Sequence, residues 1–218
     1  MTDPGRGAPV RKGLLGGTFN PPHVAHLIVA HIVHEALGLE RVLLVPTSIH
    51  AFKGEAEASA RDRAVMTELG VAGDPALEVD RIEVRRGGVS YTVDTLRELR
   101  EREPDTVWHL IVGQDNLAEL RQWRDVERLP DLAEIVLVSR GVGDGSPDVA
   151  EPALGGRRTR VRVPALEISS TTVRRRVAEG RSIRYWVPPG VEAYIAERGL
   201  YGGTSTKAAE GPGGPAGR

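Results

Sequence analysis

The sequence predicts an α/β protein built on a doubly wound parallel sheet, with a small helical part near its C-terminus. Short apolar segments alternate with longer segments of helical periodicity, which is typical of strand–helix–strand units. Residues 42–45 and 135–138 are apolar on both faces, as in parallel strands covered by helices. The chain has 218 residues, of which 40% are hydrophobic and 27% are charged, so it can bury a substantial core.

The predicted elements follow one another in a regular order. We expect strands at residues 13–15, 41–45, 77–84, 107–112, 134–138 and 160–163, each a short apolar segment. Helices are expected at residues 23–37, 59–69, 92–102, 116–128, 170–179 and 190–198, each with helical periodicity. Gly38 and Gly199 follow the first and last helices, and glycine is a common stop signal.

The ends of the chain differ in composition from its centre. We expect residues 12–202 to form a single domain, between a flexible N-terminal tail (1–11) and a disordered C-terminal tail (203–218). Both tails lack apolar periodicity and are rich in Gly, Pro or polar residues. Residues 141–156, rich in Gly, Pro and Asp, are expected to form a mobile loop within the domain.

The composition excludes several classes of protein. A formal net charge of −1 argues against a dedicated nucleic-acid-binding protein, because such proteins carry a basic excess. The absence of cysteine excludes disulfides, thiolate zinc sites and a cysteine nucleophile. No apolar segment approaches the ~18 residues that span a bilayer, and the N-terminus lacks the apolar stretch of a signal peptide. We expect a cytoplasmic protein that binds neither nucleic acid nor membrane; whether it forms a homo-oligomer is left open.

The first segment with candidate binding and catalytic residues follows the first predicted strand. Residues 16–26 read Gly-Gly-Thr-Phe-Asn-Pro-Pro-His-Val-Ala-His. Glycines at the carboxyl end of a parallel strand let a ligand approach the backbone, and the next helix N-terminus suits a phosphate. His23 and His26 project on the same side of that helix. The alternatives are a tight turn with surface histidines, or metal ligation by this pair or by His31 and His34. With no third ligand nearby, we predict no metal site.

A second such segment lies near the C-terminus. Residues 168–174 read Ile-Ser-Ser-Thr-Thr-Val-Arg. Hydroxyls and backbone amides at a helix N-terminus can donate to a phosphate, and Arg174, one turn later, can bind phosphate oxygens bidentately. Taken alone, the pattern is explained better by an ordinary Ser/Thr-capped helix with solvated arginines.

Together the two segments resemble the signatures of the HxGH nucleotidyltransferase superfamily, with Ala25 at the position of the usual glycine. The resemblance implies a Rossmann-like sheet of the nucleotidyltransferase type. It implies catalytic roles for His23, His26 and Arg174. The ATP-binding residues that it implies are Gly16, Gly17, Thr18, Phe19, Gly113, Asp115, Ile168, Ser169, Ser170 and Thr171. From its position alone, Asp115 could equally be a helix N-cap.

Three further segments narrow the resemblance. Residues 86–96 (Arg-Gly-Gly-Val-Ser-Tyr-Thr-Val-Asp-Thr-Leu), residues 111–117 (Ile-Val-Gly-Gln-Asp-Asn-Leu) and Trp123 are similar to bacterial nicotinate-mononucleotide adenylyltransferases. The resemblance spans about residues 14–201. It implies that backbone amides near Tyr91 and Thr92 bind the nicotinate carboxylate and that Trp123 stacks on the ring. Trp123 could instead be a helix-packing residue. The full set of expected acceptor-binding residues is Asn20, Lys53, Tyr91, Thr92 and Trp123.

One segment departs from the family pattern. Family members commonly carry Pro-x-x-x-Pro-Pro-His-(Lys/Arg) after the second strand, and residues 46–53 read Pro-Thr-Ser-Ile-His-Ala-Phe-Lys. Lys53 keeps the basic position, while His-Ala-Phe replaces Pro-Pro-His. The departure bears on the choice of acceptor more than on adenylyl transfer.

The implied activity is adenylyl transfer from ATP, accompanied by Mg²⁺, to nicotinate mononucleotide, giving deamido-NAD and pyrophosphate. The alternatives are a related nucleotidyltransferase with another phosphate acceptor and a non-catalytic nucleotide-binding module on the same fold.

Overall fold

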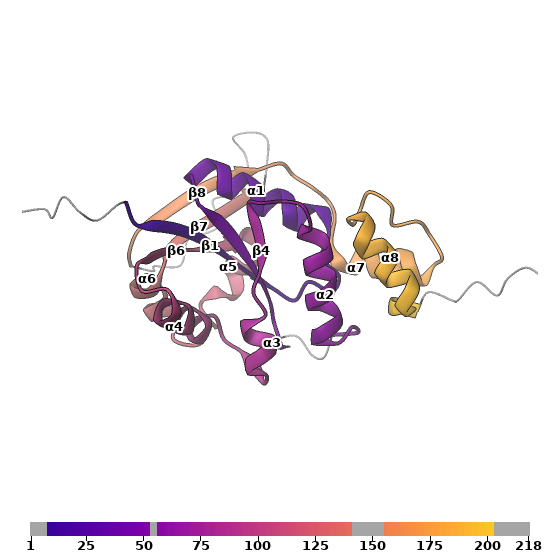
Figure 1. Cartoon of the computed structure of the whole chain (residues 1–218), viewed down its shortest axis with the longest axis horizontal. Coiled ribbons are helices and arrows are strands. Elements are labelled where there is room, and N and C mark those ends of the chain that lie inside the picture. The colour runs from indigo at the N-terminus through magenta and orange to yellow at the C-terminus, as the bar shows by residue number, and fades with distance from the viewer. Residues whose placement is uncertain (1–7, 53–55, 141–154, 203–218) are drawn as a thin grey trace, which may run out of the picture.

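The structure, a computed structural model, describes residues 8–52, 56–140 and 155–202. Its centre is a six-stranded sheet in which every pair of neighbouring strands is parallel (Figure 1). The strand order is β4-β2-β1-β6-β7-β8. The bounds are β1 (Val10–Gly17), β2 (Arg41–Pro46), β4 (Leu77–Val79), β6 (Thr106–Gly113), β7 (Glu134–Arg140) and β8 (Arg158–Val163). Because the chain runs outward from β1 and then returns to β6, a crevice for ligands is expected where the order reverses, at the carboxyl ends of these two strands.

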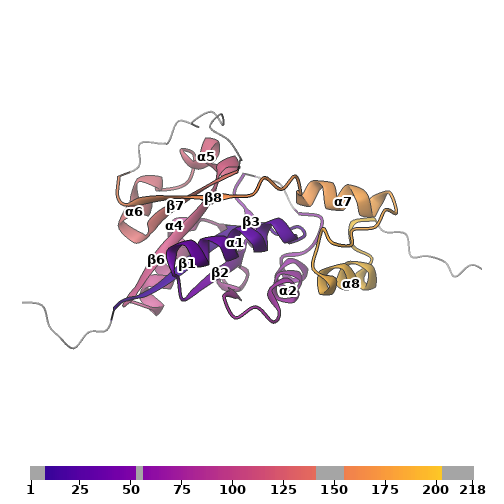
Figure 2. The ribbon, with the colours of Figure 1, turned by 90° about the horizontal axis from the view of Figure 1, so that it is seen from above.

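Helices cover both faces of this sheet (Figure 2). Val42 and Leu44 of β2 belong to a core shared with α1 (Val24–Leu37) and the end of α2 (Ala60–Val71). Leu43 and Val45 belong to the opposite core. That core is shared with α3 (Ile82–Arg86), α4 (Thr92–Arg102), α5 (Gln114–Leu120) and α6 (Leu129–Leu132). The predicted doubly wound α/β fold is therefore confirmed.

The C-terminal part adds α7 (Ser170–Ala178), α8 (Pro189–Arg198) and the 3-10 turn η2 (Leu200–Gly202) at one end of the molecule (Figure 1). Val173 of α7 and Ile195 of α8 form a third core with Met66 of α2. This packing fixes α7 against the α/β body and confirms the predicted small helical part.

Several predicted boundaries were wrong. The strand expected at residues 77–84 ends at Val79. Asp80 then accepts a hydrogen bond from the Ile82 N–H at 2.9 Å and turns the chain into α3. The first strand was expected at residues 13–15 and instead begins at Val10, which pairs with Thr106 of β6; residues 1–7 of the expected tail 1–11 lie outside the described residues.

The helix expected at residues 116–128 is broken into shorter elements. α5 ends at Leu120, and Asp125 adopts a left-handed backbone (φ 49°) before the 3-10 turn η1 (Val126–Arg128) and α6. A two-stranded pairing of β3 (Ile49–His50) with β5 (Val89–Ser90) was not predicted. Residues 141–154 of the expected loop and the expected tail 203–218 lie outside the described residues.

Candidate active site

A cavity of about 650 Å³ opens at the carboxyl edge of the central strands. Gly17 at the end of β1, Thr47 after β2, Gly113 at the end of β6 and Pro164 after β8 all line it. This is the edge at which a doubly wound parallel sheet offers a crevice to ligands. The cavity is therefore the candidate active site.

Most of the residues singled out in the sequence meet in this cavity. The lining includes Gly16, Gly17, Thr18, Phe19, Asn20, His23, His26, Tyr91, Thr92, Gly113, Trp123, Ile168, Ser169, Ser170, Thr171 and Arg174. Lys53 lies outside the described residues, and Asp115 falls in the first turn of α5 with its side chain outside them. His50 and Phe52, from the segment that departs from the family pattern, also line the cavity.

The two histidines are fixed by the start of α1. His23 is the N-cap residue, and its backbone N–H donates to Nδ1 of His26 at 3.2 Å. The two rings stack with their centroids 3.7 Å apart. Because Nδ1 of His26 accepts this hydrogen bond, the proton of its neutral ring resides on Nε2. His26 can therefore donate from Nε2 to an oxygen in the cavity.

Phe19 packs against the ring of His26. Its side chain is buried, and its ring meets that of His26 edge-on at a centroid distance of 5.0 Å. Its backbone is left-handed (φ 48°), an uncommon conformation for a bulky residue, which turns the ring into the core. Phe19 positions His26, in addition to lining the cavity.

Asn20 is buried and its side-chain amide is bound within the protein. Oδ1 accepts from the hydroxyl of Tyr201 at 2.9 Å and from the Ala58 N–H at 3.4 Å. Nδ2 donates to Glu57 at 2.5 Å. Asn20 was expected to bind the acceptor, and the structure shows it holding the loop between β1 and α1 in place.

The two signatures are in direct contact, although about 150 residues separate them in the sequence. Ser170 at the start of α7 donates to the carbonyl of Pro21 at 2.8 Å. Arg174 donates from Nη1 to the carbonyl of Asn20 at 2.9 Å, and its Nε pairs with Glu57 at 2.9 Å. Although partial burial opposes it, the hydrogen bonds from the backbone and from Asn20, with the charge of Arg174, lower the pKa of Glu57. The start of α7 and the β1–α1 loop thus form one unit.

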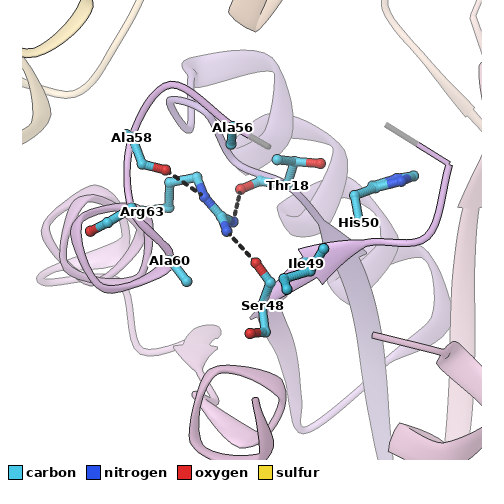
Figure 3. A pocket seen from close by; sticks show the side chains of 9 residues that line it. Thr18, Ser48, Ile49, His50, Ala56, Ala58, Ala60 and Arg63 are labelled. Atoms are coloured by element: carbon cyan, nitrogen blue, oxygen red, sulfur yellow. Dashed lines mark hydrogen bonds between the residues drawn. The ribbon is translucent and has the colours of Figure 1, made fainter. Parts of the chain in front are cut away.

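A buried arginine joins the loops behind this unit, beside a smaller hollow of about 240 Å³ (Figure 3). The guanidinium of Arg63 donates to three backbone carbonyls: Thr18 at 2.6 Å, Ser48 at 2.8 Å and Ala58 at 3.2 Å. Burial lowers the pKa of Arg63. The sequence analysis missed this residue. Arg63 lies three residues before the buried Met66 on α2, and this spacing could have indicated that the two side chains share the buried face of the helix.

The opposite wall of the cavity carries the residues expected at the acceptor. Tyr91 is the N-cap residue of α4, and Trp123 is partly buried against the same core. The guanidinium carbon of Arg124 lies 4.8 Å from the centre of the Tyr91 ring. Sequence reasoning missed Arg124, and it also missed Glu83 of α3, which is buried and lines this wall.

The described residues contain neither a metal-binding cluster nor a membrane-spanning helix. Within these residues, no three His, Cys, Asp or Glu side chains gather in a group that could hold a metal ion. None of the described helices is long and apolar enough to cross a membrane.

Comparison with known proteins shows the family to which the chain belongs. Residues 14–176 match the cytidylyltransferase-like family. A protein of Herpetosiphon aurantiacus named "probable nicotinate-nucleotide adenylyltransferase" is 41% identical over 194 residues, covering 88% of this chain and 98% of its own. A Thermus thermophilus protein of the same name is 44% identical over 192 residues, covering 88% of this chain and all of its own.

Solved structures have the same fold. The Plasmodium falciparum nicotinic acid mononucleotide adenylyltransferase in complex with NaAD superposes with a TM-score of 0.72 at 18% identity. The match covers 88% of this chain and 97% of that one. The same enzyme in complex with APC gives a TM-score of 0.68 at 17% identity. The match to the family model and the identity to full-length relatives show that the chain belongs to the cytidylyltransferase-like family and, within it, to the nicotinate-nucleotide adenylyltransferases.

Proposed function

We propose that the protein transfers the adenylyl group of ATP to nicotinate mononucleotide, releasing pyrophosphate and forming deamido-NAD. The observation that carries the proposal is the direct contact between the two signatures, made by residues that line the cavity. It brings an imidazole donor, an arginine and a helix N-terminus together beside a second wall with aromatic residues. The names of the full-length relatives support the same reaction.

The reaction needs positioning more than covalent chemistry. An oxygen of the acceptor 5′-phosphate attacks the α-phosphorus of ATP, forming one O–P bond as the bond to the pyrophosphate oxygen breaks. His26 donates from Nε2 to an oxygen of the transferring phosphate, where negative charge builds up. His23 holds His26 in that tautomer through its backbone N–H. We propose direct transfer without an adenylyl-enzyme intermediate, because fixed donors and two aligned substrates suffice.

The remaining ATP contacts follow from the shape of the cavity. Gly16 and Gly17 let the nucleotide approach the end of β1, and Gly113 does the same at the end of β6. The amides at the start of α7, where Ser169 is the N-cap residue, face the phosphates. We propose that Mg²⁺ enters with ATP, bound mostly by phosphate oxygens and water, as is usual for this ion.

The acceptor occupies the opposite wall in this proposal. The N–H groups at the start of α4, near Tyr91 and Thr92, donate to the nicotinate carboxylate. Trp123 offers its face to the pyridinium ring. Lys53 and Asp115 are proposed to contact the acceptor phosphate and the ATP ribose, as in the family that the sequence resembles.

Release of pyrophosphate tests the proposal. The protein is incubated with Mg²⁺, ATP and, separately, nicotinate mononucleotide, nicotinamide mononucleotide, pantetheine phosphate and a polyol phosphate. We expect fastest release with nicotinate mononucleotide and a product of the mass of deamido-NAD. Turnover with only another phosphate acceptor would favour a different member of the superfamily, and ATP binding without turnover would favour a non-catalytic module.

A further inference from the structure

One cationic side chain of the acceptor wall has no role in the reaction described above. Arg124 follows Trp123 in the segment after α5, and both residues line the cavity. The guanidinium carbon of Arg124 lies 4.8 Å from the centre of the Tyr91 ring, and Tyr91 lines the cavity as well. The Arg124 side chain is 51% exposed. Its guanidinium is therefore accessible to a ligand that lies beside Tyr91.

Two contacts hold this guanidinium at the start of α4. The first is the cation–π contact with Tyr91, the N-cap residue of that helix. The second is a hydrogen bond from Nη1 of Arg124 to Oδ2 of Asp94, in the first turn of the same helix, at 3.3 Å. The positive charge thus adjoins the helix N-terminus to which the proposed function assigns the ring carboxylate of the acceptor.

Most of the hydrogen-bonding capacity of Arg124 is unused within the protein. A guanidinium carries five N–H groups, and Asp94 is the one acceptor that Arg124 reaches among the residues that the structure describes. Arg174, the other arginine in the described part of the cavity lining, donates to the carbonyl of Asn20 and pairs with Glu57. Arg174 is therefore fixed within the protein, whereas Arg124 keeps donors available for a ligand.

The two pyridine mononucleotides differ in the group that would meet these donors. Nicotinate mononucleotide carries a ring carboxylate, whose two oxygens match the paired N–H groups of a guanidinium. Nicotinamide mononucleotide carries a neutral carboxamide, which has one acceptor oxygen and an NH₂ group that would face other donors. A guanidinium at this place therefore favours the acid over the amide by both charge and hydrogen bonding.

Resting on the proposed function, we propose that Arg124 is a specificity-determining residue: its guanidinium, held over the ring of Tyr91, donates to the ring carboxylate of nicotinate mononucleotide. This side chain adds a charged contact to the backbone N–H groups at the start of α4. The preference for the acid over the amide then depends on the positive charge at position 124.

The test is the ratio of kcat/KM for nicotinate mononucleotide to that for nicotinamide mononucleotide, measured in the unsubstituted protein and in Arg124→Met. Methionine keeps an unbranched apolar stem and removes the charge. The ratio should fall about tenfold, the size expected for losing one hydrogen bond to a charged group. The fall should come from a higher KM for the acid, with the values for the amide little changed. Arg124→Lys keeps a charge without the planar pair of donors and should retain part of the preference.

Arg97→Met is the matched control, because Arg124 could also favour the acid indirectly by neutralising Asp94. Arg97 lies on α4, binds the other oxygen of Asp94 at 3.2 Å and is not among the described residues that line the cavity. Its loss should leave the ratio unchanged if Arg124 contacts the acceptor directly. Thermal melting shows whether the variants are folded, and we expect them to be, since both side chains are substantially exposed.

Each other outcome contradicts a specific part of the proposal. An unchanged ratio in Arg124→Met, an equal fall in Arg97→Met, or no more preference in Arg124→Lys than in Arg124→Met overturns the role of Arg124 while the adenylyltransferase stands. Turnover of neither mononucleotide by the unsubstituted protein removes the proposed function, and the role of Arg124 with it.

Discussion

The two walls of the cavity are built in different ways. On the wall formed by the β1–α1 loop and α7, polar side chains bind one another or the backbone: Asn20, Ser170 and Arg174 all have partners within the protein. On the wall formed by α3, α4 and the segment after α5, the aromatic side chains of Tyr91 and Trp123 are only partly buried.

This difference suggests that one wall serves catalysis and the other serves acceptor recognition. The first wall is fixed before any substrate arrives, as is required of donors that stabilise charge in a transition state. The second wall keeps groups available for a ligand, as is required for choosing one acceptor over another. Substitutions in the first wall should lower kcat for every acceptor, while substitutions in the second should change the KM and the choice of acceptor.

The largest effect is expected for His26→Ala. Removing one donor aimed at the transferring phosphate should lower kcat on the order of 10²–10³-fold, with a modest change in ATP affinity. Steady-state kinetics and ATP titration measure the two quantities. His31→Ala, on the same helix but paired with Glu35 away from the cavity, is the matched control. A near-normal kcat in His26→Ala would remove His26 from the reaction.

Arg63→Met tests whether the fixed wall depends on the loops behind it. The change leaves three carbonyl oxygens without their donor and should lower kcat roughly 10–10²-fold for all acceptors, because small displacements of catalytic groups are costly. The melting temperature should fall as well. Arg61→Met, exposed on the same helix, should change neither quantity. Normal kcat in a folded Arg63→Met protein would contradict the account.

Arg174→Lys should lower kcat/KM about tenfold, equivalent to ~1.4 kcal/mol. Lysine keeps the charge but lacks the planar guanidinium, whose Nη1 and Nε reach the carbonyl of Asn20 and Glu57 from two separate positions. Arg175→Lys, at the exposed neighbouring position, should retain activity. Equal losses at the two positions would indicate a general electrostatic patch instead.

Trp123→Ala tests the second wall, which is proposed to bind the acceptor. Losing an aromatic face worth about 0.5–1.5 kcal/mol should raise the KM for both mononucleotides roughly 3–10-fold and change kcat little. The KM for ATP, measured with the same preparation, serves as the internal control. A fall in kcat with an unchanged KM would contradict the role of Trp123 in acceptor binding.

The smallest effect is expected for Tyr201→Phe, which removes the hydroxyl that binds Asn20 at 2.9 Å. One hydrogen bond contributes about 1 kcal/mol, or roughly 2–4 °C in melting temperature for a chain of this size. Thermal unfolding followed by circular dichroism measures it. No change in melting temperature would show that the Tyr201 hydroxyl does not help to hold the β1–α1 loop.

The sequence predicted the sheet and the location of most site residues for a simple physical reason. Parallel strands covered on both faces must be continuously apolar, and residues 42–45 and 135–138 show this directly. Glycines and helix caps that follow such strands fall at one edge of the sheet. Residues 16–26 and 168–174 are contiguous motifs, so their chemistry can be recognised without knowing the fold.

Features that depend on distant contacts could not be predicted. Asp80 ends β4 because it binds Arg85 and also Arg102, which lies 22 residues away, and no local pattern reveals the second contact. Glu83 and Arg63 resemble ordinary helix-surface charges in the sequence. Only the packing of α2 and α3 against the loops shows that Glu83 lines the cavity and that Arg63 joins the loops behind the β1–α1 wall.

The central claim is that the acceptor wall selects nicotinate mononucleotide, and one comparison tests it most directly. The kcat/KM values for nicotinate and nicotinamide mononucleotide are measured side by side at neutral pH with saturating ATP and Mg²⁺. Donors at the start of α4 suit a carboxylate better than a carboxamide, so the acid should be preferred at least about tenfold, or ~1.4 kcal/mol. Equal efficiencies, or activity with neither mononucleotide, would contradict the assignment and direct attention to the altered segment at residues 46–53.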